Sequence, residues 1–122
     1  MSRYLVLFAG AIFCALGLLH AVYTFLKRLA PVDPNVIEQM RSTTVRLSRG
    51  RTDMWNAWIG FNLSHSLGAV LFGVLCITAA LPVWILVLIA TIYEVLALKF
   101  WFRVPAIAIG IAGASLLIAC FV

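Results

Sequence analysis

The chain has 122 residues, of which 65% are hydrophobic, and only nine Lys/Arg and four Asp/Glu residues carry a charge. A soluble globular domain is about 45–50% apolar and about 25% charged, so this composition excludes one. Disordered chains are poor in apolar residues, and the mean hydropathy of +1.12 therefore excludes disorder as well. The composition predicts an integral membrane protein.

Four apolar stretches are long enough to cross a bilayer, which takes about 20 helical residues. They lie at about residues 4–26, 58–80, 82–98 and 104–122. Lipid offers no partners for backbone groups, so each span must be helical, and continuous apolar runs lack the alternation of a β-barrel. The sequence predicts an all-α, polytopic membrane protein: one domain, residues 1–122, forming a four-helix transmembrane bundle.

The first stretch follows Arg3 and contains no charge before Lys27. Its apolar run is longer than the core of a signal peptide, which has about 7–15 residues, and no clear small-x-small cleavage site precedes Lys27. We therefore expect this stretch to be an uncleaved first span that stays in the membrane.

The longest polar stretch, residues 27–57, joins the first and second spans. Within it, Asp33 can cap a helix, Pro34 suits the first helical position and Gly50 suits the position after a helix end. Between these residues, one helix face is formed by Val36, Ile37, Met40, Thr44 and Leu47. We expect one amphipathic interfacial helix over residues 34–49, which serves as a lipid-anchored connector or as a lid over a site in the membrane.

Eight of the nine basic residues fall in residues 27–57 and 99–103, two connections that share one side of a four-span bundle. Because cytoplasmic loops are rich in Lys and Arg, we expect a multi-pass protein of the cell inner (plasma) membrane with both termini non-cytoplasmic. Contact with the lipid bilayer accounts for the net charge of +5, so we expect no nucleic-acid partner. An aromatic belt is predicted at the cytoplasmic boundary: Trp55, Trp58, Phe100, Trp101 and Phe102.

A few polar side chains lie inside the predicted spans, where such residues usually mark a site. Counted at 1.5 Å per residue from the cytoplasmic boundary, they come from three spans at depths of about 7–10 Å. They are His20, Asn62, His65 and Glu94, with Tyr23 and Tyr93 nearby. Glycine and alanine on the same helix faces permit close packing, so we expect a buried polar cluster.

The cluster has three interpretations. Its groups can hydrogen-bond one another and only fix helix packing. They can hold a metal or haem through His20 and His65, although no HxxxH or ExxH spacing supports this, and the three cysteines lie in different spans without a CxxC. They can also form a pocket for a lipophilic small molecule.

We favour the pocket as the basis of function. In this hypothesis Glu94 and His20 grip the molecule or react with it, and general acid–base chemistry by such a pair would make the protein an enzyme. Asn62 and His65 would orient the molecule, and the pocket would be lined by Tyr23 and Tyr93. The sequence leaves open whether the molecule is transformed and assigns no cofactor.

The fourth stretch carries a row of small residues, Ala106, Gly110 and Ala114. Such rows allow helices to approach closely. We favour packing within the bundle. The alternative is contact in a homo-oligomer or a larger membrane complex, in which the protein would be an accessory or assembly subunit.

Several features between His20 and Leu67 form one pattern. His20 lies late in the first span, and the loop contains Pro34-x-Val36-x-x-x-Met40. Trp55 then precedes the run Gly60-Phe61-Asn62-Leu63-Ser64-His65-Ser66-Leu67. This pattern resembles an uncharacterised family of small four-helix bacterial integral membrane proteins. The resemblance implies the fold but no reaction, and it gives His20 more weight than His65, which is not fixed in the pattern.

Overall fold

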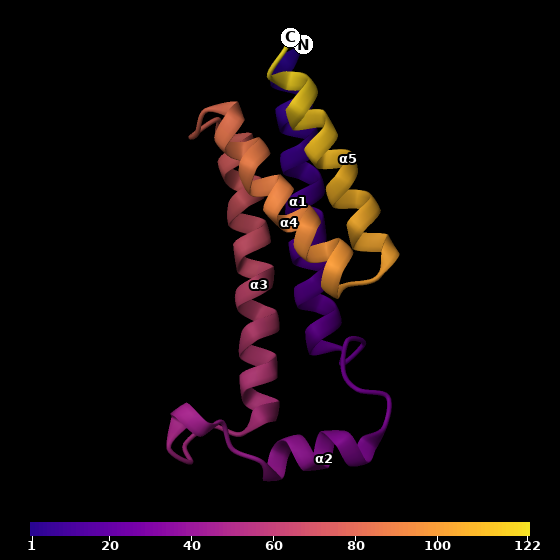
Figure 1. Cartoon of the computed structure of the whole chain (residues 1–122), viewed down its shortest axis with the longest axis vertical. Helices are drawn as coiled ribbons and strands as arrows, with labels where there is room; N and C mark the ends of the chain where they lie inside the picture. The colour runs from indigo at the N-terminus through magenta and orange to yellow at the C-terminus, as the bar shows by residue number, and fades with distance from the viewer.

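A computed structural model describes all residues, 1–122, and the chain is helical with no β-strands. The helices are α1 (Ser2–Phe25), α2 (Pro34–Ser42), the short 3-10 helix η1 (Arg46–Ser48), α3 (Met54–Ile77), α4 (Val83–Phe100) and α5 (Arg103–Ala119). The four longer helices form a bundle with both chain termini at one end, and α2 lies across the other end (Figure 1). The predicted all-α class is confirmed.

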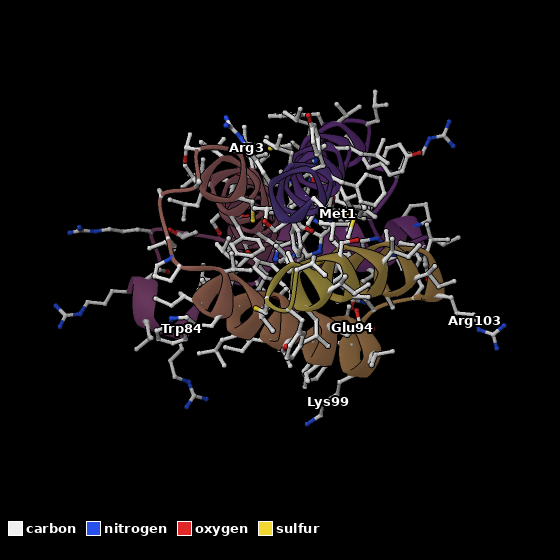
Figure 2. The ribbon with its side chains drawn as sticks, turned by 90° about the horizontal axis from the view of Figure 1, so that it is seen from above. Met1, Arg3, Trp84, Glu94, Lys99 and Arg103 are labelled. Atoms are coloured by element: carbon white, nitrogen blue, oxygen red, sulfur yellow. The ribbon has the colours of Figure 1, made fainter.

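Three of the helices, α1, α3 and α4, are long and apolar enough to cross a membrane. The fourth, α5, is apolar but has only 17 residues. α3 begins at Met54, earlier than the predicted start near Trp58, because the Asp53 side chain caps it by accepting a 2.7 Å hydrogen bond from the Asn56 backbone N–H. Seen from above, the charged ends of Lys99 and Arg103 point away from the bundle (Figure 2).

The polar connection departs from its prediction at one end. α2 begins as expected, with Pro34 at its start and Asp33 accepting a 2.9 Å hydrogen bond from the Asn35 backbone N–H. It ends at Ser42, so the predicted helix over residues 34–49 is wrong beyond that point. The reason is the β-branched run at residues 43–45, which favours extended backbone. There the Val45 N–H donates to the Thr52 carbonyl at 2.9 Å, across a turn that contains Gly50 at φ 83°.

The cap of α2 gives a local prediction. We expect Asp33→Ala to destabilise α2 by about 1 kcal/mol and to leave the bundle intact, because the cap satisfies only the first turn of this exposed helix. Faster amide hydrogen exchange at residues 35–38, with unchanged exchange in α3, would be the signature. Glu38→Ala is the control, since it removes a carboxylate from the same helix and leaves the cap. Equal exchange in the two variants would contradict the prediction.

α1 and α3 approach so closely that glycine is required at the contact. A Cβ at Gly73 would lie 2.5 Å from the Cys14 Sγ and 2.6 Å from the Gly10 carbonyl oxygen. A Cβ at Gly17 would lie 2.8 Å from the Ser66 carbonyl oxygen. In a membrane, helices associate through such close packing and not through the hydrophobic effect. This contact therefore fixes the two helices that supply His20 and His65.

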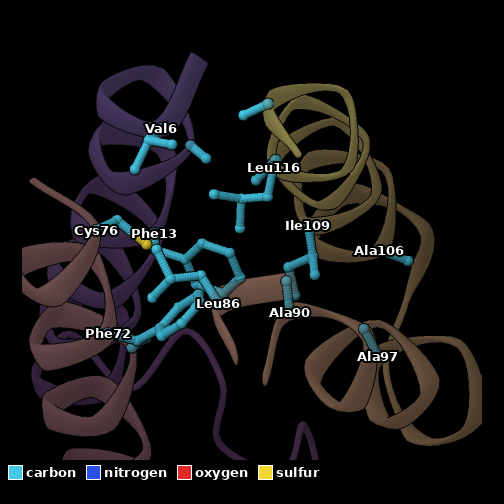
Figure 3. Close-up of a cluster of buried hydrophobic side chains, with 14 residues drawn as sticks. Val6, Phe13, Phe72, Cys76, Leu86, Ala90, Ala97, Ala106, Ile109 and Leu116 are labelled. Carbon is cyan, nitrogen blue, oxygen red and sulfur yellow. The ribbon is translucent and has the colours of Figure 1, made fainter. Parts of the chain in front are cut away.

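α5 packs against both α1 and α4, whereas α4 meets α3 through large side chains. The Phe13 and Phe72 rings make an edge-to-face contact at 4.6 Å, and Tyr93 reaches them from α4 with centroids at 5.4 and 6.0 Å. These rings belong to or border a core drawn from α1, α3, α4 and α5 (Figure 3). The core thus closes the bundle on the side of the termini and leaves the polar residues toward the α2 end.

The small residues of α5 have different surroundings. Ala106 is buried, and Gly110 faces Glu94 of α4, since a Cβ there would lie 3.4 Å from the Glu94 Oε1. Ala114 is exposed on the outside of the bundle. Gly110 therefore faces α4, Ala106 lies inside the bundle, and contact with an oligomer or a larger complex stays a prediction.

Candidate functional site

A cavity of about 120 Å³ lies among α1, α3, α4, α5 and the turn between α4 and α5. Of its 17 lining residues, 13 are hydrophobic, Tyr23 and Tyr93 among them, as in most sites for small apolar molecules. Its polar groups include the imidazoles of His20 and His65 and the phenols of Tyr23 and Tyr93. Four of the six predicted pocket residues therefore line one cavity.

Asn62 is the fifth predicted pocket residue, and it contributes to the site by holding the His20 side chain. The His20 Nε2 lies 3.0 Å from the Asn62 Oδ1, and the Asn62 Nδ2 donates a 2.8 Å hydrogen bond to the Trp58 carbonyl. The Trp58 carbonyl can only accept, so it fixes the orientation of the amide and leaves the Oδ1 toward the imidazole. His20 must then donate from Nε2. In the neutral ring its Nδ1 is consequently an acceptor, and no side-chain hydrogen bond of the chain occupies it.

Trp101 completes the site, and the sequence assigned it only to the aromatic belt. Its ring stacks on His65 with centroids 5.4 Å apart and planes at 16°, and its centroid is 4.9 Å from that of His20. The sequence contained no signal for this contact, because Trp101 was expected at the membrane boundary and the histidines about 10 Å below it. Trp101 thus covers both imidazoles at the end of the cavity.

Glu94 does not lie with the histidines, which corrects the predicted cluster. The helix face of Ala90, Glu94 and Ala97 packs toward α5, where a Cβ at Gly113 would lie 3.9 Å from the Ala90 Cβ. Figure 2 shows Glu94 between α4 and α5. Successive helical residues point about 100° apart, so Tyr93 enters the cavity and Glu94 turns away from it.

The two histidines touch each other. Their ring centroids are 5.0 Å apart at an interplanar angle of 65°. Two imidazoles on opposite sides of one metal ion have centroids roughly 6 Å apart, given metal–nitrogen distances of about 2.0 Å. No group of three or more His, Cys, Asp and Glu side chains is placed to hold a metal ion. The ring spacing therefore does not favour a haem held between His20 and His65, and a metal ion held by these two histidines would have no third ligand among the His, Cys, Asp and Glu side chains.

The chain matches no protein-family model, and comparison with curated protein sequences and with solved structures finds no relative. The resemblance to small four-helix bacterial membrane proteins therefore remains a prediction. The cavity and its side chains carry the functional argument alone.

Proposed function

We propose that the protein is a four-span inner-membrane protein whose cavity binds a lipophilic small molecule. The single observation that carries this proposal is the cavity itself: an apolar lining interrupted by two imidazoles and two phenols. A few polar groups on apolar walls orient a ligand without excluding its hydrocarbon. Enzymatic conversion of the ligand is not part of the proposal, because the acid Glu94 lies outside the cavity.

The chemistry of the ligand follows from His20. Its Nε2 is committed to Asn62, and its neutral Nδ1 is an acceptor. A ligand that complements this acceptor carries a hydroxyl or another neutral hydrogen-bond donor on an apolar body. The neighbouring rings of Trp101 and His65 favour a flat ligand group that can stack on them.

Four features support the membrane topology. Three helices have the length and composition of spans, α5 is apolar, both termini lie at one end of the bundle, and the Arg-rich connection lies at the other (Figure 1). The positive-inside rule then favours cytoplasmic placement of α2 and of the Lys99–Arg103 turn, with both termini on the non-cytoplasmic side. In this topology α2 lies on the cytoplasmic membrane surface as an interfacial helix.

Ligand content of the purified protein tests the function. We expect an organic extract of the wild type to contain a lipophilic donor molecule, which mass spectrometry detects and which falls about tenfold or more in His20→Ala. Glu94→Gln is the control and should retain the ligand, because Glu94 lies outside the cavity. A thermal scan in detergent checks that each variant is folded.

Two results would contradict the proposal. One is an extract without any ligand from folded wild type. The other is equal ligand content in wild type and folded His20→Ala. A Soret band or a stoichiometric metal in the same preparation would instead favour the haem or metal interpretation.

A further inference from the structure

A second hollow, a groove, lies between α4 and α5. It shares Ala97, Trp101 and Phe102 with the His20 cavity, but its charged residues, Glu94 and Arg103, do not line that cavity. It measures about 330 Å³ and is lined by nine residues, six of them hydrophobic. Its α4 wall contains Glu94 and Leu98, and its α5 wall contains Ala106, Ile107 and Gly110.

Glu94 is the one acidic residue of the groove. Its Oε2 has almost no exposed surface and no hydrogen-bond partner, and no ion pair joins it to a basic side chain. A carboxyl group without a partner away from water is costly, and an acid within a membrane helix usually marks a functional site. The groove therefore holds a polar group whose partner is missing from the chain.

The α5 wall carries no side chain beside the Oε1 of this carboxyl group, whereas Oε2 is buried. A Cβ at Gly110 would lie 3.4 Å from the Glu94 Oε1 and 3.7 Å from its Cδ. Any larger side chain at this position would cover the carboxyl group. Glycine leaves that position free of side-chain atoms, so a ligand group can lie beside the Glu94 Oε1.

Basic residues lie only at the other end of the groove. Arg103 lines it beside Trp101 and Phe102, about 10 Å along the helices from Glu94. The charged ends of Arg103 and Lys99 point away from the bundle (Figure 2), where water screens them. At its inner end the groove therefore combines an unpaired carboxylate with apolar walls.

We propose that this groove binds a lipophilic cation. Its positive group lies against Glu94, and its apolar part lies along Leu98 and Ile107. The Glu94 carboxylate would repel an anion, and a neutral hydrocarbon would leave the carboxylate without a partner. The positive group is an ammonium group, which either a lipid headgroup or a free hydrophobic amine supplies.

Equilibrium dialysis with radiolabelled tetraphenylphosphonium, a membrane-soluble cation, tests the site on the full chain in dodecyl maltoside. We expect saturable binding to the wild type and an affinity about tenfold or more lower in Glu94→Gln, which keeps the shape and removes the charge. Gly110→Leu, which fills the groove, should have the same effect. Glu38→Gln is the matched control, because it removes one carboxylate from the exposed helix α2.

His20→Ala is a second control and should bind the cation normally, which separates this site from the proposed function of the other cavity. Competition identifies the source of the ammonium group. Displacement by short-chain phosphatidylethanolamine points to a lipid headgroup, and displacement by dodecylamine alone points to a free amine.

Three results would overturn the proposal: wild type without saturable binding, equal affinity in wild type and Glu94→Gln, or bound probe that neither amine displaces.

Discussion

Gly73→Ala is expected to destabilise the protein by about 1–3 kcal/mol, even though alanine is the better helix former. The new methyl group would lie 2.5 Å from the Cys14 Sγ and 2.6 Å from the Gly10 carbonyl oxygen. Two of its three nearest neighbours are backbone atoms of α1, which cannot rotate away. α1 must therefore move off α3, and the core side chains between the helices lose contacts.

The matched control is Gly60→Ala in the same helix. Nothing lies within 4 Å of a Cβ at Gly60, so this variant should gain up to about 1 kcal/mol from its higher helix propensity. Thermal unfolding in detergent, followed by circular dichroism, compares the two variants. Equal midpoints would show that α1 and α3 do not meet through Gly73.

Trp101→Ala is expected to open the His20 cavity and to lower the affinity for its ligand about tenfold or more. The indole lies 4.9 Å from His20 and 5.4 Å from His65 between ring centroids. Its removal exposes both imidazoles and deletes the stacking surface for a flat ligand group. Diethylpyrocarbonate, which modifies accessible histidines, should therefore react faster with the variant than with the wild type.

Trp84→Ala is the control for this substitution, because Trp84 is exposed near the start of α4, far along that helix from Trp101. This variant should keep both the ligand content and the histidine reactivity of the wild type. If Trp101→Ala resembles Trp84→Ala in both measurements, Trp101 does not cover the site.

Much of the fold was predictable because the properties that determine it are local. Runs of apolar residues define the long helices, and Asp33 with Pro34 defines the start of α2. The end of α2 was not predictable from the face that continues through Thr44 and Leu47, since the β-branched residues 43–45 pair with residues 52–54 instead. That pairing joins positions separated in the chain, and helical spacing contains no information about it.

The depth of the site residues along their helices was predictable, but the direction in which each side chain points was predictable only in part. His20, Asn62 and His65 were expected at one level, and the structure joins them through one hydrogen bond and one ring contact. Glu94 was assigned to the same group because a single helix gives no indication of which neighbour faces its polar side. The packing of α4 on α5 decides that question, and the small residues of α5 that make it possible lie in another part of the sequence.

The unequal lengths of the helices have a consequence for the surrounding lipid. α1 and α3 have 24 residues each, and α4 and α5 have 18 and 17, or about 36 Å against roughly 26 Å at 1.5 Å per residue. In the proposed topology one flank of the bundle matches a full hydrocarbon layer and the other falls short of it. Such a mismatch thins the adjacent leaflet at a modest energy cost per ångström. Headgroups drawn inward by Lys99 and Arg103 would then lie level with Trp101. If the cavity takes its ligand from the bilayer, as the proposed function implies, the ligand would cross a locally thinned membrane to the histidines, and we expect the protein to partition toward thinner bilayers.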